Sequence, residues 1–484
     1  MTFPVTDLET LAPHLGRGLF DADTYRERRA ALAHAVPGAL LLVPGNVAMA
    51  MNFRANHYPF VQDGTFRYFF GLDMPDLVGL IDTDSGETWL FGDETGIDDA
   101  VWFGPLPSLA DLAARVGITR SADMATLVQI LGDAARQNRQ ISWPPAYSAE
   151  GTMVLARLTG QAPAAIDASV TTAGNLALVH AIVAQREVKS TAEIAQMEAA
   201  LVITAQMHHA AMAGTRPGVH EYEMVGRMEG IARGADLHFA YQPIFSGRGE
   251  VLHNMRYDRV MAAGELIVND SAARSLGGYA SDITRTIPVS GTFDPPQRRL
   301  YDAVLRAQQA AIAGARTGAR YLDLHTLAAR IMVEDLIDLG LFRGSADDVV
   351  ASGAYALAFP CGLGHQIGLD VHDMEALGED NVGYDAHIRR STLFGLRNLR
   401  LARTLREGMT VTIEPGLYFI PELTAAWRAE GRHAGLIDYD AFDRLRGFGG
   451  IRIEDDVLVT ATGGRVLGPH IARTADEVEA AMQA

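Results

Sequence analysis

Short apolar runs alternate with helix-like periodicity through the first third of the chain. Apolar runs bounded by turn residues predict strands, and apolar residues spaced three or four apart predict helices. Strands are expected at Ala39–Val43, Phe66–Leu72, Asp76–Asp82 and Glu87–Gly92, and helices at Tyr25–Ala35, Leu109–Ala114 and Met124–Arg136. The pattern predicts an α/β domain over residues 1–175, without a cluster of ligand residues, that a helix or linker near Val170–Val188 joins to a second domain over residues 176–484.

The second domain contains two similar pairs of helical patterns. Ala213-Gly214-Thr215-Arg216-Pro217-Gly218 recurs as Ala313-Gly314-Ala315-Arg316-Thr317-Gly318. The first copy lies between helical patterns at Ser190–Met212 and Glu221–Arg233, and the second between Pro296–Ile312 and Leu322–Leu339. Two unrelated glycine-ended helices could share such a segment. The matched flanks favour an internal duplication, so that a site built by both halves would lie on their pseudo-two-fold axis.

The segment Gly264–Pro288 predicts a β-hairpin that carries two carboxylates. A strand-like run ends in Asp270, and a Gly277-Gly278 turn precedes a second strand-like run that carries Asp282. Two buried carboxylates side by side are unfavourable unless a proton or a metal compensates their charge. The rest of the chain is therefore expected to supply a proton or further metal ligands.

The second half offers three such ligands, His365, Glu414 and Glu454. Alternation along the strand-like run before Glu454 puts Arg452 on the same face, where it could brace a carboxylate or a substrate anion. Four carboxylates and one imidazole suit a hard or borderline cation such as Mn²⁺ better than a thiolate-type zinc site. Taken singly, an acid at a strand end is usually a solvated terminus and a lone His365 is more often structural, so spacing leaves both interpretations open.

Composition and net charge indicate which partners and which cellular location to expect. The chain has 484 residues and a formal net charge of −18, which disfavours nucleic acid or an anionic membrane as a partner. No apolar run approaches the ~18 residues of a membrane span, and the first residues lack the pattern of a signal peptide. A single cysteine, Cys361, excludes an intrachain disulfide and agrees with a cytoplasmic location.

Five segments of the second domain carry a resemblance to a known family. They are Tyr279–Thr286, Gly362–His365, Gly368–Asp373, Ile413–Gly416 and Gly450–Asp455. In sequence and order they resemble the signature of the proline-specific metallopeptidases, the family of aminopeptidase P and prolidase with the pita-bread fold. The resemblance covers about residue 180 to the end, and the first third resembles the amino-terminal domain of that family. It implies a homodimer or homotetramer that hydrolyses peptides with proline in the second position.

The resemblance also implies a site with two divalent metal ions, most simply Mn²⁺, with Co²⁺ or Zn²⁺ as alternatives. Asp270 would bind one ion, His365 and Glu414 would bind the other, and Asp282 and Glu454 would bridge them.

Further residues match positions that act on the substrate in this family. Glu414 would be the general base, while His372 and His253 would contact the substrate and support the tetrahedral intermediate. Tyr241 and Arg452 would take part in substrate binding. In prolidases the counterpart of Arg400 pairs with the carboxylate of the substrate proline, so Arg400 would select dipeptides unless it is simply an exposed charge. Other segments resemble bacterial aminopeptidases P, so the motifs leave both activities open.

Cys361 departs from the family pattern, because the family usually has histidine at this position. A thiol donates a hydrogen bond less well than an imidazole, so substrate binding or rate could differ. The departure also leaves a non-catalytic pita-bread module that binds peptides or proteins as the alternative. A metal-free relative acting on creatine-like amidines would lack the carboxylates, which are present here.

Overall fold

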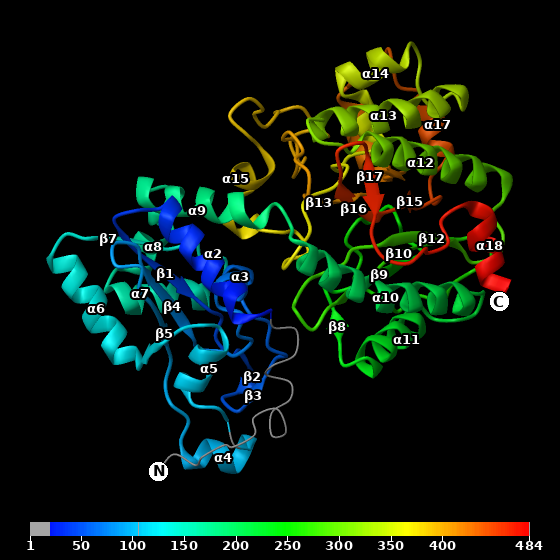
Figure 1. Cartoon of the computed structure of the whole chain (residues 1–484). Coiled ribbons are helices and arrows are strands. Elements are labelled where there is room, and N and C mark those ends of the chain that lie inside the picture. Colours follow the sequence, from blue (N-terminus) through cyan, green and yellow to red (C-terminus); the bar gives the residue numbers. More distant parts are fainter. Residues whose placement is uncertain (1–19, 105, 484) are drawn as a thin grey trace. The chain divides into compact units, whose positions relative to one another are not determined.

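The computed structural model describes residues 20–104 and 106–483, which divide into two compact units (Figure 1). The first unit contains the chain up to Arg186 together with Met374–Asn381, and the second contains Glu187–Asp373 and the chain from Val382 onward. The predicted boundary at residue 175 falls inside helix α9 (Ala173–Arg186). The first residues, for which the sequence predicts no signal peptide, lie outside the described residues.

The first unit is built on a five-stranded mixed sheet in the order β6-β5-β4-β1-β7. Its strands are β1 (Ala39–Pro44), β4 (Val78–Asp82), β5 (Thr88–Phe91), β6 (Arg120–Ala122) and β7 (Gln140–Ser142). Strand β1 pairs antiparallel with β4 and parallel with β7. The helices are α2 (Ala22–Ala35), α3 (Gly64–Phe70), α4 (Ile97–Phe103), α5 (Leu109–Arg115), α6 (Met124–Arg136), α7 (Ala149–Thr159), α8 (Pro163–Ser169) and α9. The small hairpin β2 (Ala50–Phe53) and β3 (Asn56–His57) is separate from this sheet.

One predicted strand in this unit is wrong. The run Phe66–Leu72 is not extended: Gly64–Phe70 forms helix α3. Asp63 caps the helix by accepting a hydrogen bond from the backbone N–H of Phe66, and Gly71, at φ 69°, ends it. Because nearly all of its residues are buried, the run has no polar face to reveal a helical period.

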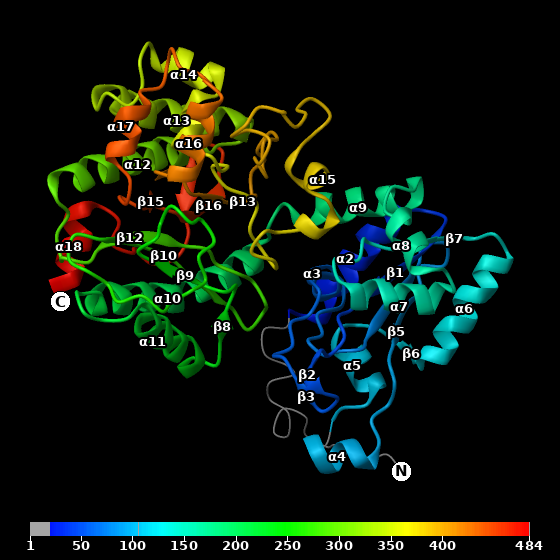
Figure 2. The same ribbon diagram turned by 180° about the vertical axis from the view of Figure 1, so that it is seen from behind.

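In the second unit, two helix pairs enclose the strands (Figures 1 and 2). The pairs are α10 (Thr191–Gly214) with α11 (Glu221–Gly234), and α12 (Pro295–Gly314) with α13 (Tyr321–Asp338). These bounds match the duplicated pattern closely. Ser190 and Glu193 form a capping box at the start of α10, each accepting a hydrogen bond from the backbone N–H of the other.

Each helix pair is followed by a three-stranded antiparallel sheet. The first is β9 (Ile244–Ser246), β10 (Leu266–Asp270) and β12 (Thr284–Pro288), and the second is β13 (Thr410–Ile413), β16 (Asp455–Val459) and β17 (Gly464–Val466). Two further pairs are β8 (His238–Phe239) with β11 (Ala273–Arg274) and β14 (Gly416–Tyr418) with β15 (Gly450–Arg452). Two equivalent helix pairs around two equivalent sheets form the pita-bread arrangement with internal duplication.

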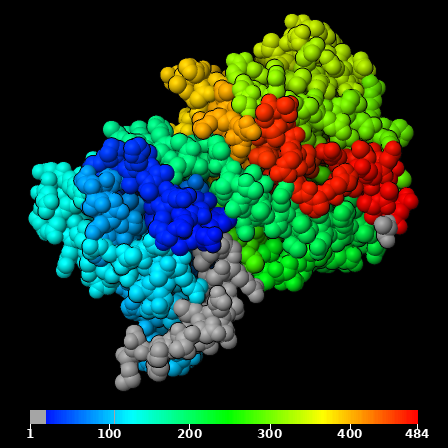
Figure 3. Space-filling view, in the orientation of Figure 1, coloured from blue at the N-terminus to red at the C-terminus, as the bar shows by residue number. Residues whose placement is uncertain are grey.

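The remaining helices of the second unit lie outside these layers. They are α14 (Ala346–Ser352), α16 (Pro421–Ala429), α17 (Tyr439–Arg444) and α18 (Ala475–Gln483), while α15 (Glu379–Gly383) spans a division between the units. Helix α18, the red end of the chain in Figure 3, lies at the surface of the second unit.

Among the described residues, no single helix is long and apolar enough to cross a membrane. Helices α8 and α9, bent by 60° at a short break, pass this test of length and composition only as a pair.

Candidate active site

Strand ends of the two related sheets place the predicted carboxylates. Asp270 is the last residue of β10, and Asp282 lies just before β12 rather than within a strand as expected. Glu414 follows β13, and Glu454 lies between β15 and β16. Each residue therefore lies at or next to the end of a hydrogen-bonded strand, which fixes its backbone.

Two backbone pairings bring these strand ends from different halves together. Asp270 is opposite Thr284 in the β10–β12 ladder, and Thr284 forms an isolated bridge with Glu454. The Thr284 hydroxyl donates a hydrogen bond to Glu454 Oε2 at 2.6 Å. The duplicated halves thus meet at the candidate site.

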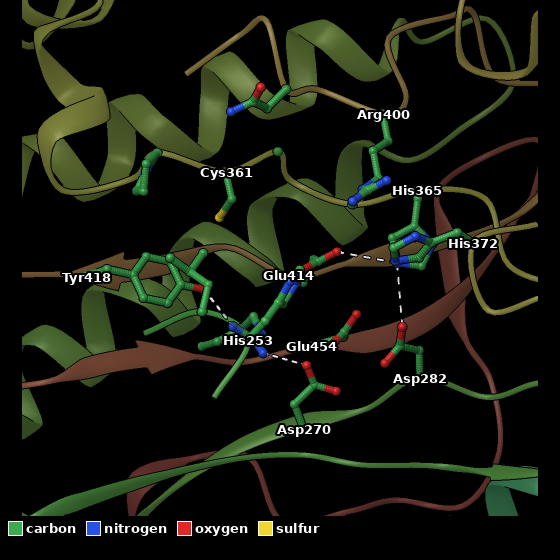
Figure 4. Close-up of a pocket in the computed structure, with 16 residues that line it drawn as sticks. His253, Asp270, Asp282, Cys361, His365, His372, Arg400, Glu414, Tyr418 and Glu454 are labelled. Atoms are coloured by element: carbon green, nitrogen blue, oxygen red, sulfur yellow. Dashed lines mark hydrogen bonds and ion pairs between the residues drawn. The ribbon is translucent and has the colours of Figure 1, made fainter. Parts of the chain in front are cut away.

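His365 completes the cluster from a segment without regular structure. Its Nε2 lies 3.5 Å from Asp282 Oδ2 and 3.5 Å from Glu414 Oε1. Ligand atoms of Asp282, His365 and Glu454 all lie within 4.8 Å of one another. His365 Nδ1 contacts the carbonyl of Gln366 at 2.9 Å, which leaves Nε2 facing the carboxylates (Figure 4).

Arg452 and Tyr241 form hydrogen bonds to two of these carboxylates, Asp270 and Asp282. Arg452 donates to Asp270 Oδ2 at 2.5 Å and is itself buried. The Tyr241 hydroxyl lies 2.5 Å from Asp270 Oδ1 and 2.6 Å from Asp282 Oδ1. Burial and the adjacent carboxylates raise the pKa of Tyr241 well above its usual value, so its proton stays between them. Their role in substrate binding remains a prediction, since these contacts are made to carboxylates.

Burial makes the charged form of these acids costly. It raises the pKa of Asp282 to about 7, with the charge of Asp270 as the second cause. Burial likewise raises the pKa of Glu414, and burial together with the charge of Asp282 raises the pKa of Glu454 well above its usual range. A bound divalent cation would offset this repulsion, and three oxygen or nitrogen ligands already converge as such an ion requires. The residues present therefore fit a divalent metal site.

The cluster lines one side of a pocket of about 340 Å³. The predicted substrate residues His253, His372 and Arg400 also line it. Arg400 and Cys361 lie on the side of the pocket opposite Asp270 (Figure 4). The His372 ring is 4.2 Å from the His365 ring, centroid to centroid. Partial burial and the cation of Arg452 lower the pKa of His253, which favours its neutral form.

Cys361 also lines this pocket, and its own thiol is protonated. Burial and the nearby charge of Glu414 raise its pKa to about 12. Because only the thiolate reacts, we expect thiol labelling at pH 8 to be about 10³-fold slower in the native protein than in urea. As the chain has a single cysteine, a thiol-reactive chromophore reports on this residue alone. Equal rates in both states would contradict the protonated thiol.

The sequence interpretation missed two polar pocket residues, Asn398 and Tyr418. The Tyr418 hydroxyl accepts a hydrogen bond from Arg452 Nη1 at 2.9 Å. The sequence did contain a signal for Tyr418. Tyr418 is two residues after Gly416, so on a strand both residues lie on the same face. Gly416 pairs with Arg452, which places Tyr418 near the candidate site. Asn398 has no comparable signal, since its segment is irregular.

Comparisons with known proteins agree with this architecture. Residues 25–142 match the aminopeptidase P N-terminal domain. The chain is 31% identical to human Xaa-Pro dipeptidase over 87% of this chain and 84% of the relative, and 30% identical to Escherichia coli Xaa-Pro aminopeptidase over 95% and 97%. The solved structure of Pseudomonas aeruginosa aminopeptidase PepP superposes with a TM-score of 0.78 at 26% identity, covering 96% of this chain and 98% of that one. Residues 195–461, which hold all the candidate ligands, match metallopeptidase family M24, and the chain belongs to that family.

Proposed function

We propose that this chain is a metal-dependent exopeptidase that hydrolyses the bond between an N-terminal residue and proline. The observation that carries the proposal is the convergence of Asp282, His365 and Glu454 within 4.8 Å in a pocket of an M24 chain. The names of its relatives, Xaa-Pro dipeptidase and Xaa-Pro aminopeptidase, support the specificity for proline. A non-catalytic binding module has no support here, since it would not need these buried acids.

Asp270, Asp282, His365, Glu414 and Glu454 would together hold two divalent ions, with Mn²⁺ the first choice for this ligand set. Four carboxylates offset the charge of two such ions. When bound, the ions would act as Lewis acids toward the scissile carbonyl. Arg452 and Tyr241 would keep Asp270 and Asp282 in place through the hydrogen bonds already described.

The residues across the pocket would act on the peptide itself. Glu414 would accept the proton of the attacking water at its carboxylate. His372 and His253 line the pocket within reach of a peptide at the carboxylate cluster, and each can donate a hydrogen bond to the developing oxyanion. Two donors and one base around a single carbonyl provide for attack and for stabilisation of the intermediate.

Arg400 would decide the length of the substrate. Its side chain lines the pocket on the side opposite Asp270, where a guanidinium can pair with the free carboxylate of a dipeptide. We therefore propose an Xaa-Pro dipeptidase, with cleavage of longer Xaa-Pro peptides as the competing outcome.

Parallel assays of an Xaa-Pro dipeptide and an Xaa-Pro-Yaa peptide test both parts. With Mn²⁺ we expect the dipeptide to be cleaved faster, and chelation to abolish cleavage of both. Arg400→Met should lower kcat/KM for the dipeptide by about 10²-fold, the size of one charge-assisted pair, and leave the longer peptide nearly unchanged.

Arg397→Met is the matched control, because Arg397 is exposed and stacks on Phe394 in the same segment. Faster cleavage of the longer peptide would make the enzyme an aminopeptidase P. Activity that survives chelation would refute the metal mechanism, and activity on neither peptide would refute the proposed function.

We further propose a cytoplasmic location and a homodimer or homotetramer, as the family resemblance implies. The single cysteine agrees with a reducing compartment. The net charge of −18 disfavours nucleic acid or an anionic membrane as a partner. Sedimentation of the purified protein would settle the assembly.

A further inference from the structure

The segment that carries His372 has no helix or strand to fix it. Residues 368–373 are bends and turns, so their position depends on individual contacts. The backbone N–H of Ile367 donates to the carbonyl of Thr410, and the carbonyl of Gly368 accepts from Ala280. These contacts hold the start of the segment, whereas His372 lies near its end.

Asp373 closes the segment next to His372. Its backbone N–H donates to the carbonyl of Gln366 at 2.9 Å, and its Oδ1 accepts from the backbone N–H of Asp370 at 3.3 Å. Its Oδ2 accepts from Lys189 Nζ at 2.7 Å. Both side chains of this ion pair are 1% exposed, so neither charge has water as an alternative partner.

The surrounding backbone is shaped around this ion pair. A Cβ atom on Gly368 would lie 2.5 Å from Asp373 Oδ2 and 2.9 Å from Lys189 Cε, so only glycine lets the pair approach the segment. Met374, the next residue, adopts φ 64°, a left-handed conformation that a residue other than glycine keeps only where neighbouring contacts impose it. The contacts of Asp373 thus determine the path of the chain at His372.

Two residues before Lys189, Glu187 makes the corresponding contacts to the segment of Arg400. Glu187 is 1% exposed and lies 2.7 Å from Arg403 Nη1, and it also pairs with Arg406. Arg403 in turn donates to the carbonyl of Val382, and its backbone N–H donates to that of Gly383. A Cβ atom on Gly383 would lie 1.8 Å from the carbonyl oxygen of Arg400, so the end of α15 packs directly on the backbone of Arg400.

The stretch Glu187–Lys189 is itself fixed to the second sheet. Val188 bridges Met409, and the backbone N–H of Lys189 donates to the carbonyl of Gly408 at 2.8 Å. Gly408 and Met409 directly precede β13, and Glu414 directly follows it. One short stretch therefore connects the strand of the candidate base with the segments of both substrate residues.

We propose that Lys189, through Asp373, is a positioning residue for His372, and that Glu187, through Arg403, is a positioning residue for Arg400. The inference rests on the proposed function for the roles of His372 and Arg400. The two buried charges hold two irregular segments at a fixed distance from the candidate metal ligands. Neither residue lines the pocket, so each acts only through its partner.

A double-mutant cycle tests whether Lys189 positions His372. Lys189→Met should lower kcat by about 10- to 100-fold with little change in KM, because a small displacement of a group that contacts the transition state costs this much. In the background of His372→Ala, the same change should cost less than twofold further. Multiplicative losses in the double variant would overturn the proposal, because Lys189 would then act independently of His372.

The proposal for Glu187 predicts a change in KM rather than in kcat. Glu187→Gln should raise KM for the Xaa-Pro dipeptide about tenfold, and have no further effect in the background of Arg400→Met. It should leave cleavage of the longer peptide near the wild-type rate. A fall in kcat for both peptides would show that Glu187 does not act through Arg400.

Two further experiments distinguish a loss of positioning from a loss of stability. One replaces both residues of the ion pair, and the other measures hydrogen exchange, which does not require peptidase activity. Lys189→Met with Asp373→Leu replaces the ion pair by apolar side chains, which often preserves stability, and should still lower kcat. Hydrogen exchange in Lys189→Met should quicken within residues 366–373, and not in Arg343→Met, which breaks an ion pair to Asp438 elsewhere in this unit. Unchanged exchange would overturn the proposal even if the chain cleaved no peptide, whereas quicker exchange without peptidase activity would refute only the proposed function.

Discussion

Replacing Glu414 by glutamine is expected to lower kcat on Xaa-Pro peptides by about 10³-fold or more, the upper range for loss of a general base. Glutamine keeps the size of the side chain but carries no charge and accepts no proton. Glu414 Oε1 lies 3.5 Å from His365 Nε2 and 3.4 Å from the Thr412 hydroxyl, so the substituted amide has room and partners in the same place. Activity should fall while the fold is retained.

Thermal unfolding and metal content of Glu414→Gln distinguish the two roles proposed for this residue. A full complement of Mn²⁺ with a low kcat would indicate the base, and loss of one ion would indicate the ligand. Glu430→Gln, an exposed acid at the end of α16, is the matched control and should retain full activity. Wild-type activity in Glu414→Gln would contradict both roles.

The duplicated helices were predictable because their signals are local. Capping boxes, glycine ends and helical periodicity all act within a few residues, and α10 to α13 follow them closely. Prediction failed for α3, where burial on all sides removed the period that distinguishes a helix from a strand.

The candidate ligands were predictable for a different reason. A buried acid at a strand end is unfavourable alone, so several such acids imply a shared counter-charge. The structure places Asp282, His365 and Glu454 together, yet the pairing that achieves this, Thr284 with Glu454, joins residues 170 positions apart. No local pattern encodes such a contact.

The supporting charges were not predictable from sequence. Lys189 follows α9 and directly precedes the N-cap of α10, where a lysine is ordinarily solvated. Its burial against Asp373 arises because an irregular segment 184 positions later returns to it. Contacts of this kind depend on the tertiary fold rather than on periodicity or turn chemistry.

Replacing Asp282 by asparagine is expected to stabilise the metal-free protein at pH 8 while abolishing its activity. The pKa of Asp282 is about 7 in the folded protein, raised by burial and by Asp270 from 3.8. Between these two pH values the folded state holds a proton that the unfolded state lacks. The stability of the metal-free protein therefore decreases as the pH rises from about 4 to about 7 through this group.

Asparagine removes this dependence, because it does not ionise and its Oδ1 can still accept the hydrogen bond from Tyr241. The difference between Asp282→Asn and wild type should be small near pH 4 and grow to roughly 4 kcal/mol above pH 7, the value of about three pKa units. Urea unfolding in a chelator at pH 5 and pH 8 measures it. Asp440→Asn, an exposed acid on α17, should behave as wild type at both pH values.

Divalent metal should reduce this difference in stability. At about 100 times its dissociation constant a ligand stabilises the folded state by about 2.7 kcal/mol, and Mn²⁺ should stabilise wild type at pH 8 but not Asp282→Asn. Parallel pH dependence of the two proteins in chelator would refute the raised pKa, and equal stabilisation by Mn²⁺ would refute Asp282 as a ligand. The carboxylate is destabilising to the metal-free fold, so its presence would be explained by the cation that we propose it binds rather than by folding.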